Sequence, residues 1–235
     1  RTYGTWNFRA GGPAVTNNDG SIPSEVSVNN DMGFSVVKWT QNLQQLYTIG
    51  HGMGKVPSLI IAKSINGVGN WEVYSAPVGV DNGLILNEAG VSVPMPAWGS
   101  FQPTNNLFLF TQTPGEYVAY CFANSEMSHV GYYSGIVIEE GPMVTLPFKP
   151  AMLLIKRFSG TDSNWILYDN GRNPYNSVVK ELYPDLARNG GVYPGVDFLS
   201  NGFKLRTDGL AINQSGFPIL YLAISEQSFK HARGR

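Results

Sequence analysis

One segment occurs twice in this sequence, and that repeat restricts the fold more than any other feature. Each copy opens with a proline and a short apolar run that ends in lysine, passes through a polar turn, and continues with an Asn-Trp pair and a tyrosine. The repeated positions are Pro57, Lys63, Trp71, Tyr74, Pro150, Lys156, Trp165 and Tyr168. The copies are offset by 93 residues before the turn and by 94 after it. Because turns accept insertions whereas paired strands cannot slip without reversing their faces, this spacing is typical of a duplicated strand-turn-strand unit.

Each copy is predicted to form a β-hairpin. Proline suits the first residue of a strand, because it has a fixed φ and no N–H group. The apolar run that follows is short, which favours a strand buried on both faces over a helix. Residues 64–69 and 157–163 contain the Gly, Ser, Asn and Asp that turns require. We therefore interpret the repeated residues as structural rather than as a binding site.

The strands that close the two copies are repeated as well. Residues 117–122 and 219–224 are both rich in aliphatic and aromatic side chains, and they are offset by 102 residues. We predict an all-β protein of two tandem, β-sandwich-like lobes, with at most short helical turns, the best candidate being residues 177–186. The predicted segments are an N-terminal segment laid onto the first lobe at 1–32, a first β repeat at 33–127 and a second β repeat at 128–235.

Composition supports an all-β chain and excludes several functions. The 27 glycines and 15 prolines are typical of many short strands joined by turns. Charged residues are only 14% of the chain and the formal net charge is −1, which disfavours a nucleic-acid partner. No apolar run reaches the ~18–20 residues of a membrane helix, so no membrane partner is expected. The single cysteine, Cys121, is expected to be a small core residue, and Arg1 is compatible with a processed product or a fragment of a longer protein.

No motif predicts catalysis, a metal or a cofactor. The glycine-rich stretch 50–55 is followed by Pro57 and a strand-like run, whereas a phosphate-binding loop leads into a helix. The three histidines are too scattered for a metal site. Glu139 and Glu140 are adjacent, so on a strand they would point to opposite faces, and the following Gly-Pro favours a solvated turn. A non-enzymatic protein without a cofactor is therefore expected.

Sugar binding without chemistry remains open, because it requires only exposed aromatic faces beside amides and carboxylates. His51 lies between two glycines, where a loop could present it. Trp98 lies within residues 78–106, which we predict to be a long surface loop. These two residues, with Tyr175 and Tyr193, are the candidate ligand-binding side chains. The alternative for each aromatic residue is a place in the core or in a subunit interface.

Several stretches together resemble a duplicated β domain of uncharacterised function that is found in virion structural proteins and tail fibres of tailed bacteriophages. The likeness spans nearly the whole chain. It is carried by GTWNFR at 4–9, GFSVV at 33–37, GHGMGKVP at 50–57, YVAYCFA at 117–123 and DFLSNGFK at 197–204. The second repeat lacks the His-Gly loop of the first, so any role of that loop belongs to one lobe.

The resemblance implies a component of the virion, exposed on the tail or particle surface, and it transfers no catalytic residues. The expected function is that of a tail-fibre or receptor-binding part that presents loops to the host cell. The partners implied are other virion proteins, further copies of the same chain in a homo-oligomer such as a trimer, and a host-surface glycan or protein. The alternatives are a capsid-decorating or tail-associated subunit and, less favoured, a polysaccharide depolymerase.

Overall fold

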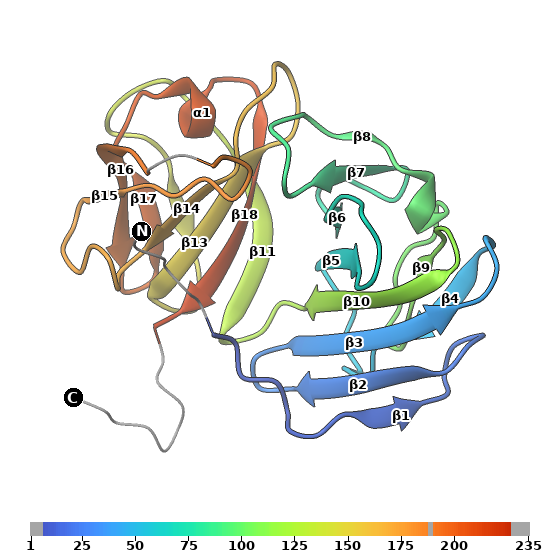
Figure 1. Ribbon diagram of the computed structural model, residues 1–235. Helices are drawn as coiled ribbons and strands as arrows, with labels where there is room; N and C mark the ends of the chain where they lie inside the picture. The colour runs from blue at the N-terminus through green and yellow to red at the C-terminus, as the bar shows by residue number, and fades with distance from the viewer. Residues whose placement is uncertain (1–6, 188–189, 227–235) are drawn as a thin grey trace.

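The computed structural model describes residues 7–187 and 190–226, and almost all of its regular structure is β-strand, as predicted (Figure 1). The helical elements in the described residues are a 3₁₀ turn, η1 (Pro96–Trp98), and a single-turn helix, α1 (Leu210–Asn213). No described helix has the length and apolar character needed to span a membrane. The all-β fold class is therefore confirmed.

The first half of the chain, from β1 to β10, forms one large antiparallel sheet and one small one. The order in the large sheet is β1 (Val15–Asn17), β2 (Ser24–Asn29), β3 (Phe34–Gln41), β10 (Gly115–Phe122), β5 (Leu59–Ser64), β6 (Glu72–Ser75), β7 (Asn82–Ile85) and β8 (Val93–Pro94). The small sheet pairs β4 (Tyr47–Gly50) with β9 (Leu107–Phe110). The described part of the N-terminal segment thus adds β1 and β2 to the edge of β3.

The second half, from β11 to β18, forms two four-stranded antiparallel sheets. One has the order β11 (Ser128–Ser134), β18 (Pro218–Ser225), β13 (Pro150–Arg157) and β14 (Ile166–Asp169). The other has the order β12 (Met143–Thr145), β17 (Gly202–Leu205), β16 (Val192–Leu199) and β15 (Val178–Lys180). Both predicted hairpins are present, because β5 pairs with β6 and β13 pairs with β14.

The two halves share strand order and register. The order β3-β10-β5-β6 in the first half corresponds to β11-β18-β13-β14 in the second. Ile60 lies opposite Tyr74 and Cys121, and the residues at the repeat offsets show the same pairing, with Leu153 opposite Tyr168 and Ala223. A duplicated unit predicts this agreement, because register is fixed wherever side chains are buried. The lobe boundaries at 33–127 and 128–235 stay a prediction.

Three hydrophobic clusters lie on the faces of these sheets, and we call them the first, central and second cores. The first core lies between the large sheet and β4–β9, and includes Trp39, Ile49, Ile60, Trp98, Phe108 and Cys121. The second core lies between the two sheets of the second half, and includes Leu153, Tyr168, Val196, Phe203 and Tyr221. The central core joins the halves and includes Phe34, Leu59, Val73, Leu154, Trp165 and Leu222.

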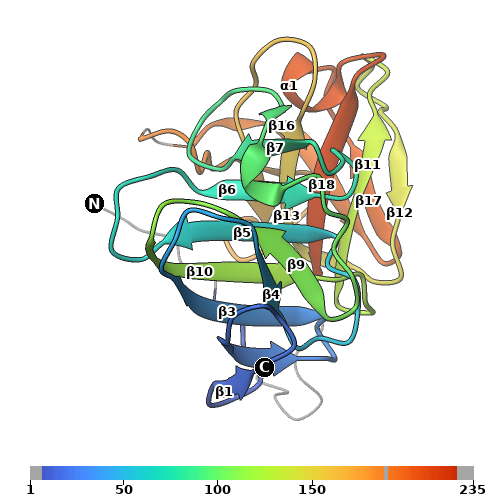
Figure 2. The same cartoon turned by 90° about the vertical axis from the view of Figure 1, so that its right-hand side faces the viewer.

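The central core explains why the repeated strands are apolar without alternation. Leu59 and Ile61 face the central core, while Ile60 and Ala62 between them face the first core. Successive side chains of a strand point to opposite faces, so a sheet covered on both sides needs apolar residues at every position. Figures 1 and 2 show the two halves packed side by side with their main strands running in different directions.

The repeated tryptophans and tyrosines occupy equivalent places. Trp165 lies in the central core and the partly buried Trp71 packs against the same core, whereas Tyr74 lies in the first core and Tyr168 in the second. An odd spacing of three residues along a strand places the two side chains of each pair on opposite faces. The repeated aromatic residues thus pack the sheets against the cores, in agreement with the structural role predicted from the sequence.

Two local predictions were wrong. Residues 177–186 contain β15 and a bridge between Leu182 and Leu167, and no helix. Residues 78–106, expected to be a long surface loop, contain β7, β8 and η1, and Met95, Ala97 and Trp98 from this stretch are buried in the first core. In both places strand pairing and burial override the weak local pattern.

Removing a side chain from the central core is expected to destabilise the whole chain. Leu222→Ala should lower the free energy of unfolding by about 2–5 kcal/mol, because it leaves a cavity between the halves. Guanidinium unfolding followed by tryptophan fluorescence and by circular dichroism measures this change. The exposed control, Leu43→Ala, should change it by less than about 0.5 kcal/mol. Two separate transitions in the wild-type protein would contradict the idea that the central core couples the halves.

Candidate functional site

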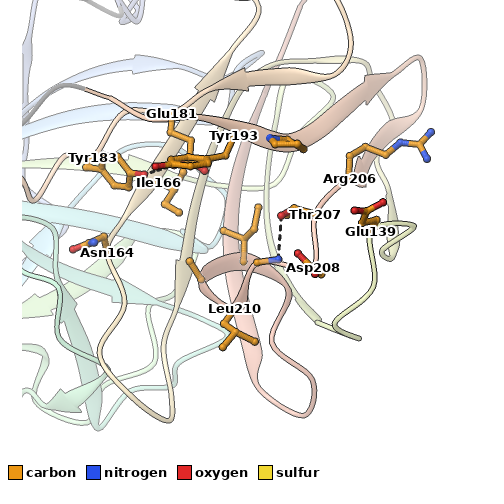
Figure 3. Close-up of a pocket in the computed structure, with 14 residues that line it drawn as sticks. Glu139, Asn164, Ile166, Glu181, Tyr183, Tyr193, Arg206, Thr207, Asp208 and Leu210 are labelled. Atoms are coloured by element: carbon orange, nitrogen blue, oxygen red, sulfur yellow. Dashed lines mark hydrogen bonds between the residues drawn. The ribbon is translucent and has the colours of Figure 1, made fainter.

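A pocket of about 610 Å³ opens at one end of the second half (Figure 3). Asn164 and Ile166 reach it from the start of β14, and Tyr193 from β16. The segment that follows β15 supplies Glu181 and Tyr183, the connection between β11 and β12 supplies Glu139, and the connection between β17 and β18 supplies residues 206–212. The size falls within the range of about 300–1,000 Å³ that is typical of small-ligand sites.

Glu181 is the buried carboxylate of this pocket, and two tyrosines hold it. The Tyr168 hydroxyl donates to Oε1 over 2.6 Å, and the Tyr183 hydroxyl donates to Oε2. Burial raises the pKa of Tyr168 well above its ordinary value, so this phenol stays protonated and remains a donor. A Cβ at Gly190 would lie 1.8 Å from the Glu181 carbonyl oxygen, so glycine is required where the chain passes Glu181. Glu181 is therefore a fixed hydrogen-bond acceptor in the wall of the pocket.

Arg206 places a positive charge in the same pocket. Its Nε–H donates to Asp197 Oδ2 over 2.5 Å, and its Nη1–H donates to Glu140 Oε1. Lys204 also binds Glu140, over 2.6 Å, and this hydrogen bond lowers the pKa of the Glu140 carboxyl. The hydrogen bond to Asp197 raises the pKa of Arg206, so the guanidinium is charged at every physiological pH. Two carboxylates thus fix the position of the guanidinium.

Part of the remaining lining is accessible to a ligand. The side chain of Tyr193 is 61% exposed, and Leu210 is also largely exposed. Figure 3 shows Tyr193 on the side of the pocket that carries Glu181 and Tyr183, with Glu139 and Arg206 on the opposite side. An aromatic face, an amide, carboxylates and a guanidinium can together contact both the apolar face and the hydroxyl groups of a sugar. The arrangement suits a polar, hydroxyl-rich ligand.

Of the four predicted ligand-binding residues, the structure places one, Tyr193, in this pocket. Tyr175 is 81% exposed in the connection between β14 and β15, and it is not part of the lining. The structure therefore does not bring the two tyrosines together in this pocket.

The prediction that a loop presents His51 is wrong, because its side chain is fully buried. Nε2 lies 3.1 Å from the carbonyl oxygen of Thr104, and Nδ1 accepts the Met53 N–H over 3.3 Å. These contacts require the proton on Nε2, and burial lowers the pKa of the ring. His51 is a neutral residue that fixes the loop after β4.

The prediction that Trp98 is exposed is also wrong. It is 2% exposed, and its ring contacts Phe110 with centroids 5.1 Å apart. Trp39 and Tyr133, two other aromatic residues that could have formed a binding face, are buried in the first and second cores. The alternative of core packing holds for these three residues.

The repeated lysines share one structural role. Lys63 Nζ donates to the Gly69 carbonyl over 2.5 Å, and Lys156 Nζ donates to the equivalent carbonyl of Ser163. Each lysine thus closes the turn of its own hairpin. Lys156 also donates to the Ala89 carbonyl of the first half over 3.0 Å, so it links the two halves near the place where the β7–β8 connection approaches the second hairpin (Figure 1).

Sequence reasoning missed Glu181, which lies in the stretch 177–186 predicted to form a helical turn. Its partners come from β14 and from the segment after β15, and no local pattern relates these segments. In the described part of the chain, no group of three or more His, Cys, Asp or Glu side chains is arranged to bind a metal ion.

Comparison with known proteins matches the chain to a protein family. The model of a family described as a domain of unknown function (DUF7483) matches residues 1–228. Neither the search of curated proteins nor the search of solved structures found a match.

The buried Lys156 is expected to make stability depend on pH. Its side chain is 0% exposed, and burial lowers its pKa from 10.5 to about 8. Between these two values the unfolded chain holds a proton that the folded chain has lost, so folding becomes more favourable as the pH rises. From pH 7.5 to 9.5, wild type should gain about 1–2 kcal/mol of stability relative to Lys156→Met.

Denaturant unfolding of both proteins at each pH measures this difference, and the tyrosines and Cys121 common to both cancel in the comparison. An equal pH dependence in the two proteins would show that the folded and unfolded chains bind the Lys156 proton equally well.

Proposed function

This chain belongs to the DUF7483 family of domains of unknown function, and we propose that it is a non-enzymatic structural protein of a bacteriophage particle that presents a pocket to host-surface glycans. The supporting observation is the 610 Å³ pocket, which combines the exposed Tyr193 ring with Glu181, Asn164 and Arg206. Sugars are recognised by this combination of an aromatic face with fixed hydrogen-bonding groups.

The state of Glu181 favours binding over catalysis. A general acid or base must exchange a proton with its substrate. Both oxygens of Glu181 already accept hydrogen bonds from tyrosines, which hold the carboxylate in an acceptor role. A depolymerase with Glu181 as its catalytic acid is therefore disfavoured.

The location on a tail or particle surface rests on the sequence resemblance, carried by stretches such as 33–37 and 50–57. The central core supports a role in display, because it fixes the two halves against each other and so holds the pocket rigidly. Many copies on one particle would turn weak single contacts into strong attachment.

A second candidate function, a capsid-decorating or tail-associated subunit, is favoured by one exposed apolar loop. Ile136, Val137 and Ile138 are consecutive and largely exposed. Val137 has a φ of 56°, which is rare for a β-branched residue. The buried Asn213 side chain accepts the Ile136 N–H and donates to the Ile138 carbonyl, so the loop is held in place. Rigid apolar side chains of this kind suit a protein neighbour.

Replacing the pocket tyrosine should weaken glycan binding. On an array of bacterial surface glycans probed with the oligomerised chain, Tyr193→Ala should reduce binding about twofold to tenfold, because a stacking face is lost. Tyr175→Ala is the matched control, since Tyr175 is an exposed tyrosine outside the pocket, and it should bind like wild type. No binding by wild type, or equal losses in both variants, would refute the proposed pocket.

Two further measurements separate the alternatives. Release of reducing ends from a bound polysaccharide would establish a depolymerase and overturn the non-enzymatic assignment. Imaging of the intact particle locates the chain, and density on the capsid would favour the decorating role over the tail.

A further inference from the structure

The first half of the chain has a smaller cavity at its own end. Its volume is about 230 Å³, and it lies between the β5–β6 turn and the connection from β9 to β10. The polar side chains that line it include Lys63, Asn70, Glu72, Gln112 and Tyr117.

The cavities of the two halves are formed in part by equivalent residues. Asn70 and Glu72 line the first-half cavity, and Asn164 and Ile166, at the repeat offset of 94, line the second-half pocket. The shared register of the two hairpins establishes this equivalence. A carboxyl group therefore stands in the first half where the second half has an aliphatic side chain.

Packing does not require that carboxyl group. Glu72 Oε1 accepts the Gln112 side-chain amide over 2.5 Å, but Oε2 is shielded from water and has no hydrogen-bond partner among the described residues. A buried acceptor without a partner destabilises the folded state. Ile166 shows that an apolar side chain fills the equivalent position without this penalty.

We propose that the first-half cavity is a second ligand site that takes one sugar unit or a similarly small neutral polyol, with a ligand hydroxyl donating to Oε2 of Glu72. Glu72 lines the cavity, and the proposal requires its carboxylate to rotate so that Oε2 meets the ligand. The volume lies below the usual range for drug-sized ligands, which limits the ligand to a small unit. Lys63 would repel an ammonium ligand and Glu72 would repel a carboxylate, so a neutral ligand fits best.

The proposed contact makes binding depend on pH. Burial raises the pKa of Glu72 to about 7. A hydroxyl donates more strongly to the ionised carboxylate than to the protonated acid, so affinity should be up to about tenfold weaker at pH 6 than at pH 8. The other titratable groups around the cavity are Lys63 and Tyr117 in its lining, Glu88 bound to Asn70, and Glu116 bound to Asn66.

The test is a titration of the full chain with methyl α-glucoside, methyl α-galactoside, methyl α-mannoside and N-acetylglucosamine, followed by amide chemical shifts in NMR. Saturable shifts are expected at Gly67, Gly69 and the Gln112 side chain. Glu72→Gln should weaken binding at least about tenfold and remove its dependence on pH. Glu126→Gln, an exposed acid in the connection between β10 and β11, is the control and should behave like wild type.

Absence of saturable shifts for every sugar at pH 8 would overturn the proposal, as would equal affinity in wild type and Glu72→Gln. If Glu72→Gln does not fold, Glu72→Ile, which carries the residue of the second half, replaces it. The pH dependence of wild-type binding is a test by itself, since equal affinity at pH 6 and pH 8 would contradict a role for the Glu72 carboxylate. The site is separable from the second-half pocket, because Tyr193→Ala should leave the shifts at Gly67 and Gly69 unchanged.

Discussion

The contact across the central core, between the large sheet of the first half and the β11-β18-β13-β14 sheet of the second, is the interaction on which the rest of the structure depends. Burying one leucine or phenylalanine side chain contributes about 1.5–3 kcal/mol, and this core contains many such residues from both halves. Exposed ion pairs such as Lys149–Glu226 contribute about 0–1 kcal/mol each. The arrangement of the halves is therefore set by apolar burial, and the polar links, such as Lys156 to Ala89, follow from it.

A core on both faces of each main sheet restricts where the protein can vary. Strand positions must stay apolar, so chemical differences between the halves appear at the strand ends and in the connections. The change from Glu72 to Ile166 at equivalent positions illustrates this. The connection between β17 and β18, which carries residues 206–212 into the larger pocket, is also longer than the connection between β9 and β10 that lines the smaller cavity. Both cavities lie at such ends, where the fold tolerates new side chains.

The errors at His51 and Trp98 have a common physical cause. Glycines around the histidine and prolines around the tryptophan are typical of turns, and turns are usually exposed. Here the Trp98 side chain is buried in the first core. The His51 side chain is buried against the loop that contains Thr104. The local sequence indicates the backbone conformation of such a segment, but the exposure of its side chains depends on which other parts of the fold pack against it.

The sequence by itself determined the all-β class, the two hairpins and the register they share, because period, turn residues and repeat spacing are local properties of the chain. It also identified the interior place of Cys121 and the structural, rather than ligand-binding, role of the repeated tryptophans and tyrosines. Only the tertiary structure decided that the large sheet of the first half faces the β11-β18-β13-β14 sheet of the second. It also decided that Glu181 meets Tyr168 and Tyr183 beside the connection from β17 to β18. The residues of the pocket come from separate stretches between 139 and 212, and no local pattern encodes their distances, because only the packing of the sheets brings those stretches together.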